Sequence, residues 1–346
     1  MTHQNRPPAI QVTGLRKAFG DKTVLDGIDL TIPEGTVFAL LGPNGAGKTT
    51  TVQILSTLIP ASGGQAQVAG HNVQAEPDAV RSAIGVTGQF SAVDKLLTGR
   101  ENMLLMADLC HLSRDEGRER ATQLLEEFEL TEAAGKPAAT YSGGMQRRLD
   151  IAMTLMIKPP PSSPAPFILF LDEPTTGLDP RGRRRMWQIV RDLVADGVTI
   201  FLTTQYLEEA DELADRIAVL DHGQIVAEGT PEELKRLVPG SHIRLDFPSA
   251  AELEAAAAAL PGASREAPEA GQESQEGQEG RLGESFHLRI ASDGSVGSLR
   301  SVLDQLDAHS IEVTALTVHT PDLDDAFLAL TGNPVTETAP TQPASR

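Results

Sequence analysis

Residues 42–49, GPNGAGKT, constrain the fold of this chain more than any other part of the sequence. They follow an apolar run, VFALLG at 37–42, and they precede a helical pattern, TTVQILSTL. In this strand–loop–helix context, glycines let backbone N–H groups turn inward around phosphate oxygens, and the helix N-terminus adds positive potential. The segment therefore predicts a phosphate-binding loop (Walker A) at the end of a buried strand, and with it an α/β fold.

Two side chains of this loop carry specific chemistry. Lys48 would bridge the β- and γ-phosphates of a nucleotide, and the hydroxyl of Thr49 would ligate Mg²⁺. The nucleotide contacts predicted for the loop as a whole come from Gly42, Asn44, Gly45, Ala46, Gly47, Lys48, Thr49 and Thr50.

Short apolar runs alternate with longer amphipathic stretches from residue 9 to about residue 230, which indicates an α/β domain around a largely parallel sheet. The runs at 37–42, 167–171 and 199–204 are continuously apolar or β-branched, as expected for strands buried on both faces. The first 35 residues alternate and contain turn glycines, which favours an antiparallel β cap.

Residues from about 90 to 157 show helical rather than strand periodicity. Thr98 with Glu101, and Ser113 with Glu116, have the spacing of capping boxes at helix starts. We therefore expect a helical subdomain inserted into the α/β body.

A second apolar run, FILFLDEP at 167–174, ends in two carboxylates. Asp172, at the strand end, is placed to hold Mg²⁺ directly or through water. Glu173 is then free to orient or deprotonate a water molecule that faces the γ-phosphate. Such acidic pairs are common on protein surfaces, and this one is informative because the same chain carries a phosphate loop.

Composition limits the partners that this chain suits. Its formal net charge of −19 argues against nucleic acid, because a phosphate-binding surface needs an excess of basic residues. The single cysteine, Cys110, excludes an internal disulfide and is expected in the core. We find neither a secretion signal nor a run of about 18 apolar residues, so the chain is not expected to cross a membrane unaided.

The sequence predicts two domains. We place a nucleotide-binding domain at 9–240 and a C-terminal α+β accessory domain at 241–332. Residues 262–284 interrupt the accessory domain, and their Glu, Gln and Gly content predicts a disordered acidic linker. The proline-rich stretch at 159–167 predicts a surface loop, and residues 333–346 predict a frayed tail.

The segment YSGGMQRRLDIAMTLM at 141–156 predicts a helix that begins at two glycines. Ser142 can cap this helix, and the bare N–H groups of Gly143 and Gly144 could meet an anion. Taken alone, the segment is a capped helix of the kind found in many unrelated proteins. Between a phosphate loop and an acidic strand end, it resembles the signature sequence of ABC-transporter ATPases.

The order of the motifs extends this resemblance over residues 9–240. The phosphate loop is followed by Gln89 in VTGQF, the SGG segment, LDEP, GLD at 177–179 and a polar residue after a strand, Gln205. The resemblance implies a P-loop NTPase of ABC type with an antiparallel β cap and an inserted helical subdomain, plus a small C-terminal α+β accessory domain.

In the family that this chain resembles, two nucleotide-binding domains meet head to tail with ATP between them. The resemblance therefore implies a homodimer in which each ATP lies between one phosphate loop and the signature of the other subunit. Ser142, Gly143 and Gly144 would contact the ATP that the other subunit binds, and Asp179 would help to bridge the dimer.

The resemblance also implies roles for two residues outside these motifs. Gln89 would reach Mg²⁺ and the attacking water, and would link the site to the helical subdomain. Phe19, in LRKAFGDK, would stack on the adenine of ATP. The alternative for Phe19 is an ordinary core phenylalanine.

Gln205 follows the strand at 199–204, at the carboxyl end where α/β proteins place their chemistry. Taken alone, it is more often a surface amide, but most ABC ATPases have a histidine here that hydrogen-bonds the γ-phosphate. The resemblance thus implies that Gln205 is a γ-phosphate sensor. Tyr141 and Met145 replace the Leu and Gln of the commoner ABC signature. These replacements, and the C-terminal segment PDLDDAFLALTG at 321–332, resemble the daunorubicin/doxorubicin-resistance branch of ABC ATP-binding subunits.

The function implied is the ATP-binding and ATP-hydrolysing subunit of an ABC exporter, which powers efflux of a hydrophobic compound such as a drug or antibiotic. Its partner would be a separate integral membrane permease. The chain would be located at the cytoplasmic face of the cell membrane. Two alternatives stay open: a soluble ABC ATPase of translation or DNA maintenance, and a regulatory ATP-binding protein with weak hydrolysis. The single phosphate loop and acidic charge weigh against the former, whereas Gln205 keeps the latter open.

Overall fold

The computed structural model describes residues 8–88, 92–157, 167–237, 241–260, 262–265, 286–292, 295–319 and 322–332. Gln89, most of the predicted loop at 159–167, most of the predicted linker at 262–284 and the predicted tail lie outside these residues. The chain divides into two compact units: unit 1 comprises Met1–Leu234 and Phe327–Arg346, and unit 2 comprises Lys235–Ala326.

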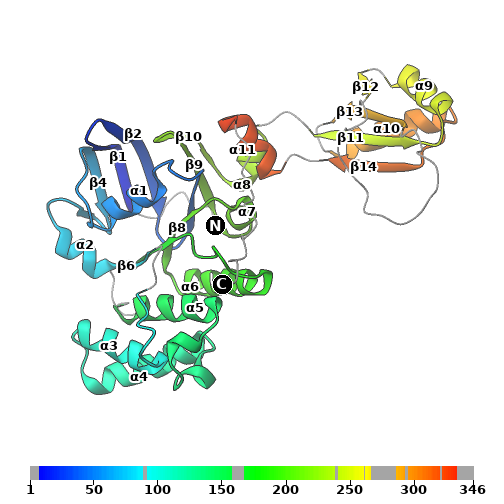
Figure 1. The fold of residues 1–346 in the computed structure, drawn as a ribbon. Helices are drawn as coiled ribbons and strands as arrows, with labels where there is room; N and C mark the ends of the chain where they lie inside the picture. Colours follow the sequence, from blue (N-terminus) through cyan, green and yellow to red (C-terminus); the bar gives the residue numbers. More distant parts are fainter. Residues whose placement is uncertain are drawn as a thin grey trace, which may run out of the picture. The chain divides into compact units, whose positions relative to one another are not determined.

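Unit 1 is built on a six-stranded sheet with the order β10-β9-β3-β8-β7-β6. Strands β6, β8, β9 and β10 are labelled in Figure 1. Its strands are β3 (Val37–Leu41), β6 (Ile84–Thr87), β7 (Ile168–Asp172), β8 (Thr199–Thr204), β9 (Arg216–Asp221) and β10 (Gln224–Gly229). The strands from β9 to β6 are parallel, and β10 pairs antiparallel with β9 at the edge. Every residue of β3, β7 and β8 is buried, which confirms the prediction of strands covered on both faces.

A second, antiparallel sheet has the order β2-β1-β4-β5. Its strands are β1 (Pro8–Phe19), β2 (Lys22–Pro33), β4 (Gly63–Val68) and β5 (His71–Asn72). Buried side chains of this sheet, such as Ile10 and Leu30, share one hydrophobic cluster with Phe38 and Phe201 of the parallel sheet. One face of the antiparallel sheet is therefore covered, which accounts for its alternating sequence and confirms the predicted β cap.

The helical part of unit 1 lies at the opposite end of the unit from β1 and β2 (Figure 1). It comprises α3 (Gly99–Leu109), α4 (Arg114–Glu127), α5 (Gly143–Thr154) and the 3₁₀ turns η2 (Thr131–Ala133), η3 (Ala138–Thr140) and η4 (Leu155–Ile157). Both predicted capping boxes are confirmed, Thr98 with Glu101 and Ser113 with Glu116. Cys110, expected in the core, is instead half-buried because it forms the C-cap of α3.

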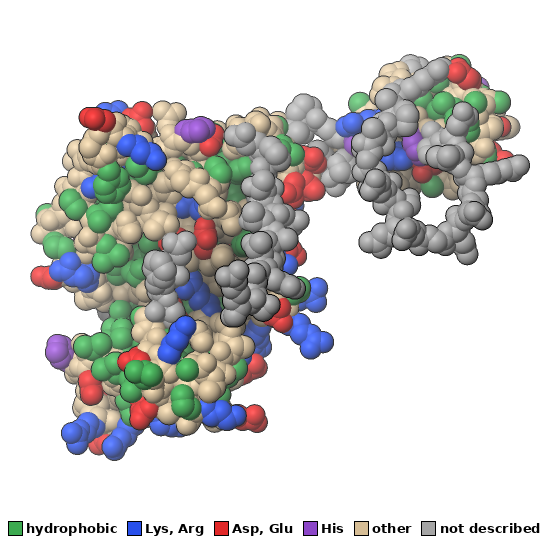
Figure 2. Space-filling view, viewed as in Figure 1, with side chains coloured by type: hydrophobic (Ala, Val, Ile, Leu, Met, Phe, Trp, Pro, Cys, Tyr) green, Lys and Arg blue, Asp and Glu red, His purple; other side chains and the backbone are tan. Residues whose placement is uncertain are grey.

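The other helices described in unit 1 are α1 (Lys48–Leu55), α2 (Pro77–Ala83), α6 (Pro180–Ala195), α7 (Leu207–Leu213) and α8 (Pro231–Lys235), which ends at the unit boundary. In the described part of the chain, no helix combines the length and the apolar character needed to cross a bilayer. On the face of unit 1 shown in Figure 2, acidic and basic side chains are interspersed.

Unit 2 contains a four-stranded antiparallel sheet with the order β12-β13-β11-β14. In chain order its elements are β11 (His242–Phe247), α9 (Ala250–Ala259), β12 (Ala263–Arg265), β13 (Phe286–Ala291), α10 (Val296–Ala308) and β14 (Ala315–His319), followed by α11 (Leu323–Thr331), in which the unit ends. This β-α-β-β-α-β order with the first and third strands central is the ferredoxin-like arrangement. The predicted α+β accessory domain thus has its own core, in which Ile243, Leu245 and Leu288 are buried.

Candidate active site

The carboxyl ends of three adjacent parallel strands meet at one edge of the large sheet. Strand β8 lies between β3 and β7 in the sheet, although it follows both in the sequence. The pairing sets Thr203 beside Asp172, and the N–H of Gly42 donates to the carbonyl oxygen of Thr204 at 3.3 Å. The phosphate loop, Gln205 and the acidic pair therefore begin side by side.

The phosphate loop has a backbone conformation that requires its glycines. Gly45 and Gly47 have φ angles of 83° and 116°, in the left-handed region. A methyl group on Gly42 would lie 2.3 Å from the carbonyl oxygen of Leu220, so a larger residue does not fit. Helix α1 begins at Lys48, which leaves its first N–H groups at the loop. The other residues predicted to contact the nucleotide differ in exposure. Asn44 and Thr49 are exposed, Thr50 is half-buried, and Ala46 is buried.

Lys48 is buried at the mouth of this loop, with 5% of the residue exposed. Its Nζ donates to the carbonyl oxygens of Gly42 at 2.6 Å and Pro43 at 3.2 Å, and it lies 3.7 Å from Oε1 of Glu173. Burial lowers the pKa of Lys48, and the carboxylates of Glu173 and Asp172 oppose this shift. The lysine thus faces the acidic pair across the edge of the sheet.

Asp172 and Thr49 lie close enough to share a metal ion. The Thr49 hydroxyl donates to Oδ2 of Asp172 at 3.1 Å, and the Thr203 hydroxyl also donates to this carboxylate. Mg²⁺ prefers oxygen ligands and is commonly bound by one or two protein groups together with phosphate oxygens and water. A hydroxyl next to a carboxylate, beside a phosphate loop, fits that donor set.

Glu173 has an unusual backbone conformation directly after β7. Its φ of 48° places it in the left-handed region, which is uncommon for a residue other than glycine. Its N–H donates to the carbonyl oxygen of Thr203 at 3.0 Å, and its Oε2 accepts from the Thr176 hydroxyl at 3.3 Å. Together with Asp172 and Arg147, it lines a cavity of about 210 Å³. The carboxylate therefore borders a space in which a water molecule could be oriented.

Gln205 is half-buried and directly follows β8. The N–H of Tyr206 donates to the Thr204 hydroxyl at 2.9 Å, which shapes the turn before α7. The structure brings Gln205 to the same sheet edge as Lys48 and Asp172. Its contact with a γ-phosphate stays a prediction.

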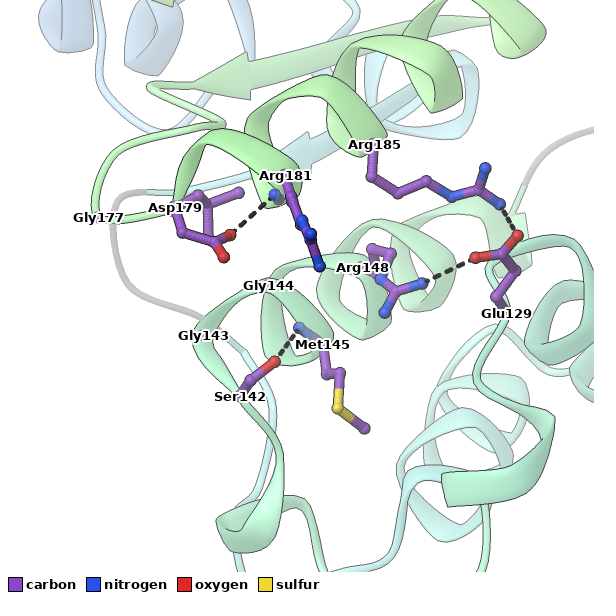
Figure 3. A pocket seen from close by; sticks show the side chains of 12 residues that line it. Glu129, Ser142, Gly143, Gly144, Met145, Arg148, Gly177, Asp179, Arg181 and Arg185 are labelled. Carbon is purple, nitrogen blue, oxygen red and sulfur yellow. Dashed lines mark hydrogen bonds and ion pairs between the residues drawn. The ribbon is translucent and has the colours of Figure 1, made fainter.

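Ser142 and Asp179 begin two helices at a second cavity, of about 470 Å³ (Figure 3). The Ser142 hydroxyl accepts from the N–H of Met145 at 3.3 Å, which confirms the predicted cap of α5. Asp179 Oδ1 accepts from the N–H of Gly182 at 2.8 Å and caps α6 in the same way. Two helix N-termini, one of which includes Gly143 and Gly144, thus contribute to the lining of this cavity, and a helix N-terminus attracts anions.

Basic side chains add to the positive character of this second cavity. Arg148, Arg181 and Arg185 line it, together with Glu129. Figure 3 shows Glu129 between two arginines: it pairs with Arg148 at 3.5 Å and also with Arg185. Lys48 is not among the lining residues. The cavity therefore suits an anionic group.

Phe19 lies at the end of β1 and is 52% exposed, so it is not a core phenylalanine. The Lys17 ammonium lies 4.7 Å from the centroid of its ring, at cation–π distance. An exposed aromatic ring is available to a nucleotide base, and the stacking on adenine stays a prediction.

Two charged residues near the sheet edge, one largely buried and one fully buried, were not predicted from the sequence. Arg147 donates to the carbonyl oxygen of Asp172 at 2.8 Å. Glu209 is 1% exposed, and burial raises the pKa of its carboxyl group. In the sequence, Arg147 stands next to Arg148 and Glu209 stands next to Glu208, and such pairs of like charges are typical of a protein surface. Only the packing shows which residue of each pair points inward.

Comparison with known proteins relates this chain to a family and to solved structures. A family model described as ABC transporter matches residues 25–176. The chain is 45% identical over 325 residues to the daunorubicin resistance ATP-binding protein DrrA2 of Streptomyces coeruleorubidus, covering 94% of this chain and 95% of that protein. It is 40% identical over 333 residues to the doxorubicin resistance ATP-binding protein DrrA of Mycobacterium tuberculosis, covering 96% of each. A solved ATP-binding subunit of an ABC transporter matches 66% of this chain and 92% of its own, with a TM-score of 0.58 and 27% identity.

Proposed function

Because this chain belongs to the ABC transporter family of ATP-binding proteins, we propose that it is the ATP-hydrolysing subunit of an exporter of a hydrophobic compound. The resemblance and the fold class predicted from the sequence are confirmed by these relatives. The observation that carries the proposal is the juxtaposition of Lys48, at the start of α1, with Asp172 and Glu173 at the end of β7. The phosphate loop binds the triphosphate there, and the acidic pair acts on the γ-phosphate end.

Each residue has a distinct part in this proposal. Lys48 would hold the β- and γ-phosphates, and Asp172 with the Thr49 hydroxyl would hold Mg²⁺. When bound, Mg²⁺ neutralises negative charge on the phosphates. Glu173 would orient the attacking water and accept its proton, and the Gln205 amide would donate to a γ-phosphate oxygen.

The cavity beside Ser142 supports a homodimer as part of this proposal. It presents two helix N-termini and three arginines, and Lys48 of the same chain does not line it. In a head-to-tail dimer, the γ-phosphate of ATP held by the phosphate loop of one copy would enter this cavity of the other. Asp179, which caps α6 at its edge, would then lie at the interface.

The transport role of the proposal rests on the relatives. Two of them are named for daunorubicin and doxorubicin resistance, which favours an exporter over a regulatory or soluble ATPase. We propose that this chain binds to the cytoplasmic face of a separate integral membrane permease, which provides the path for the compound.

The transport role can be tested with a membrane protein that co-purifies with this chain. The two are reconstituted in lipid vesicles with this chain outside, and ATP-dependent doxorubicin uptake is followed by fluorescence. We expect uptake and faster ATP hydrolysis only when both proteins are present. Equal hydrolysis with and without the membrane protein, and no uptake, would contradict the exporter role.

A pH profile tests the role of Gln205. An amide stays neutral, whereas an imidazole gains a charge near its pKa of about 6.5. We expect the ratio of Gln205→His turnover to wild-type turnover to change by about threefold or more between about pH 6 and 8. The change should follow the titration of one group, the introduced imidazole. The two profiles are measured by phosphate release under identical buffers. Parallel profiles would show that ionisation at this position does not affect hydrolysis.

A further inference from the structure

Arg147 connects the signature helix α5 to two strand ends of the parallel sheet. Its Nη2 donates to the carbonyl oxygen of Asp172, at the end of β7, at 2.8 Å. Its Nη1 donates to the carbonyl oxygen of Gly88, the residue after β6, at 3.0 Å. One guanidinium therefore fixes the main chain at the ends of two neighbouring strands.

Asp150, one turn further along α5, completes this arrangement. Its Oδ2 lies 3.3 Å from Nη1 of Arg147, and its Oδ1 accepts from the N–H of Ala92 at 3.0 Å. Gly88 and Ala92 stand on either side of residues 89–91. The pair Arg147–Asp150 thus holds the main chain at Gly88 and at Ala92.

Burial makes these contacts strong and specific. The side chains of Arg147 and Asp150 are 12% and 3% exposed. A methyl group on Gly85 of β6 would lie 2.5 Å from Cγ2 of Thr154, so α5 packs closely against this strand. Buried charge-assisted hydrogen bonds in a close-packed setting are screened little by solvent. The helix and the two strand ends therefore behave as one body.

The guanidinium also borders the space where hydrolysis is proposed. Arg147 lines the cavity of about 210 Å³ together with Asp172 and Glu173. Its hydrogen bond goes to the main chain of Asp172, the residue whose side chain would hold Mg²⁺. A small displacement of this main chain would move the carboxylate away from Thr49.

We propose that Arg147 and Asp150 are a positioning pair, which aligns the main chain at Asp172, Gly88 and Ala92 with the signature helix. This inference rests on the proposed function, because it concerns the geometry of the same site. Arginine suits position 147 because a planar fork of donors serves two carbonyl oxygens and a carboxylate together.

The test replaces Arg147 with lysine, which keeps the charge beside Asp150 but not the fork. A matched control is Arg120→Lys, because Arg120 also donates to a carbonyl oxygen of the main chain, that of Leu155, away from the sheet edge. For each protein, ATP affinity is measured by calorimetry in EDTA and again in Mg²⁺, and turnover is measured by phosphate release. Circular dichroism and melting temperature verify folding, and Asp150→Asn serves as a second variant.

We expect Arg147→Lys and Asp150→Asn to bind ATP in EDTA within about twofold of the wild type, since the hydrogen bonds described above hold Gly88, Ala92 and Asp172, which lie outside the phosphate loop. The gain in affinity on adding Mg²⁺ should fall by about fivefold or more, and turnover by about tenfold, whereas Arg120→Lys changes neither. The inference would be overturned if the Arg147 and Asp150 variants gained as much affinity from Mg²⁺ as Arg120→Lys does. It would also be overturned if these variants lost as much ATP affinity in EDTA as they lose in Mg²⁺. If the wild type bound Mg-ATP without hydrolysing it, and the Arg147 and Asp150 variants but not Arg120→Lys lost the Mg²⁺-dependent gain, the proposed hydrolysis would fail and the positioning role would stand.

Discussion

The Glu173→Gln variant should hydrolyse Mg-ATP more slowly than the wild type by a factor of about 10²–10⁴, the usual contribution of a general base. Glutamine has nearly the same shape as glutamate, but its amide cannot accept the proton of the attacking water. Glu173 borders the cavity next to Asp172, and its carboxylate lies 3.7 Å from Nζ of Lys48. ATP should still bind, because the phosphate loop is unchanged. Phosphate release and equilibrium ATP binding are measured on the same preparation.

The same substitution at Glu212 is the control for this experiment. Glu212 is exposed and pairs with Arg191 on the surface, so Glu212→Gln should retain the turnover of the wild type. Unchanged turnover in Glu173→Gln would assign the water-activating role to another residue. If the wild type binds ATP but neither it nor Glu173→Gln hydrolyses ATP, the result would instead support the regulatory alternative.

The Lys48→Ala variant should lose most of its affinity for ATP. A hydrogen bond to a charged group contributes roughly 1.5–3 kcal/mol, so we expect binding to weaken by about 10- to 150-fold. Turnover should fall further, because the lysine also stabilises charge on the γ-phosphate in the transition state. Affinity is measured by calorimetry with ATP, and turnover by phosphate release.

Lys136→Ala is the matched control for Lys48→Ala, since Lys136 is exposed and lies in the helical part of unit 1. It should bind ATP as the wild type does. The melting temperature is compared as well, because Lys48 also donates to the carbonyl oxygen of Gly42 and its loss could loosen the loop. Wild-type affinity in a folded Lys48→Ala variant would show that the nucleotide is held elsewhere.

Local patterns in the sequence were sufficient for several features of the fold. The apolar runs predicted β3, β7 and β8 because strands covered on both faces contain few polar residues. The capping boxes at Thr98 and Ser113 predicted two helix starts because the hydrogen bonds involved span only three residues. Where the motif itself supplies the chemistry, as in the phosphate loop, the sequence also predicted the ligand.

Contacts between distant segments depended on the tertiary structure. The placement of β8 between β3 and β7 brings Gln205 beside the phosphate loop, and no local pattern encodes strand order. The arginines beside Ser142 come from different helices, so their convergence is invisible along the chain.

The sequence by itself determined the phosphate loop, the acidic strand end and the signature, since each is a short motif whose chemistry follows from adjacent residues. Only the tertiary structure distinguished Arg147 from its neighbour Arg148. The former donates to the main chain at two strand ends, while the latter lines the cavity shown in Figure 3. The physical reason is that a helix turns by about 100° per residue, so adjacent arginines point to different surroundings.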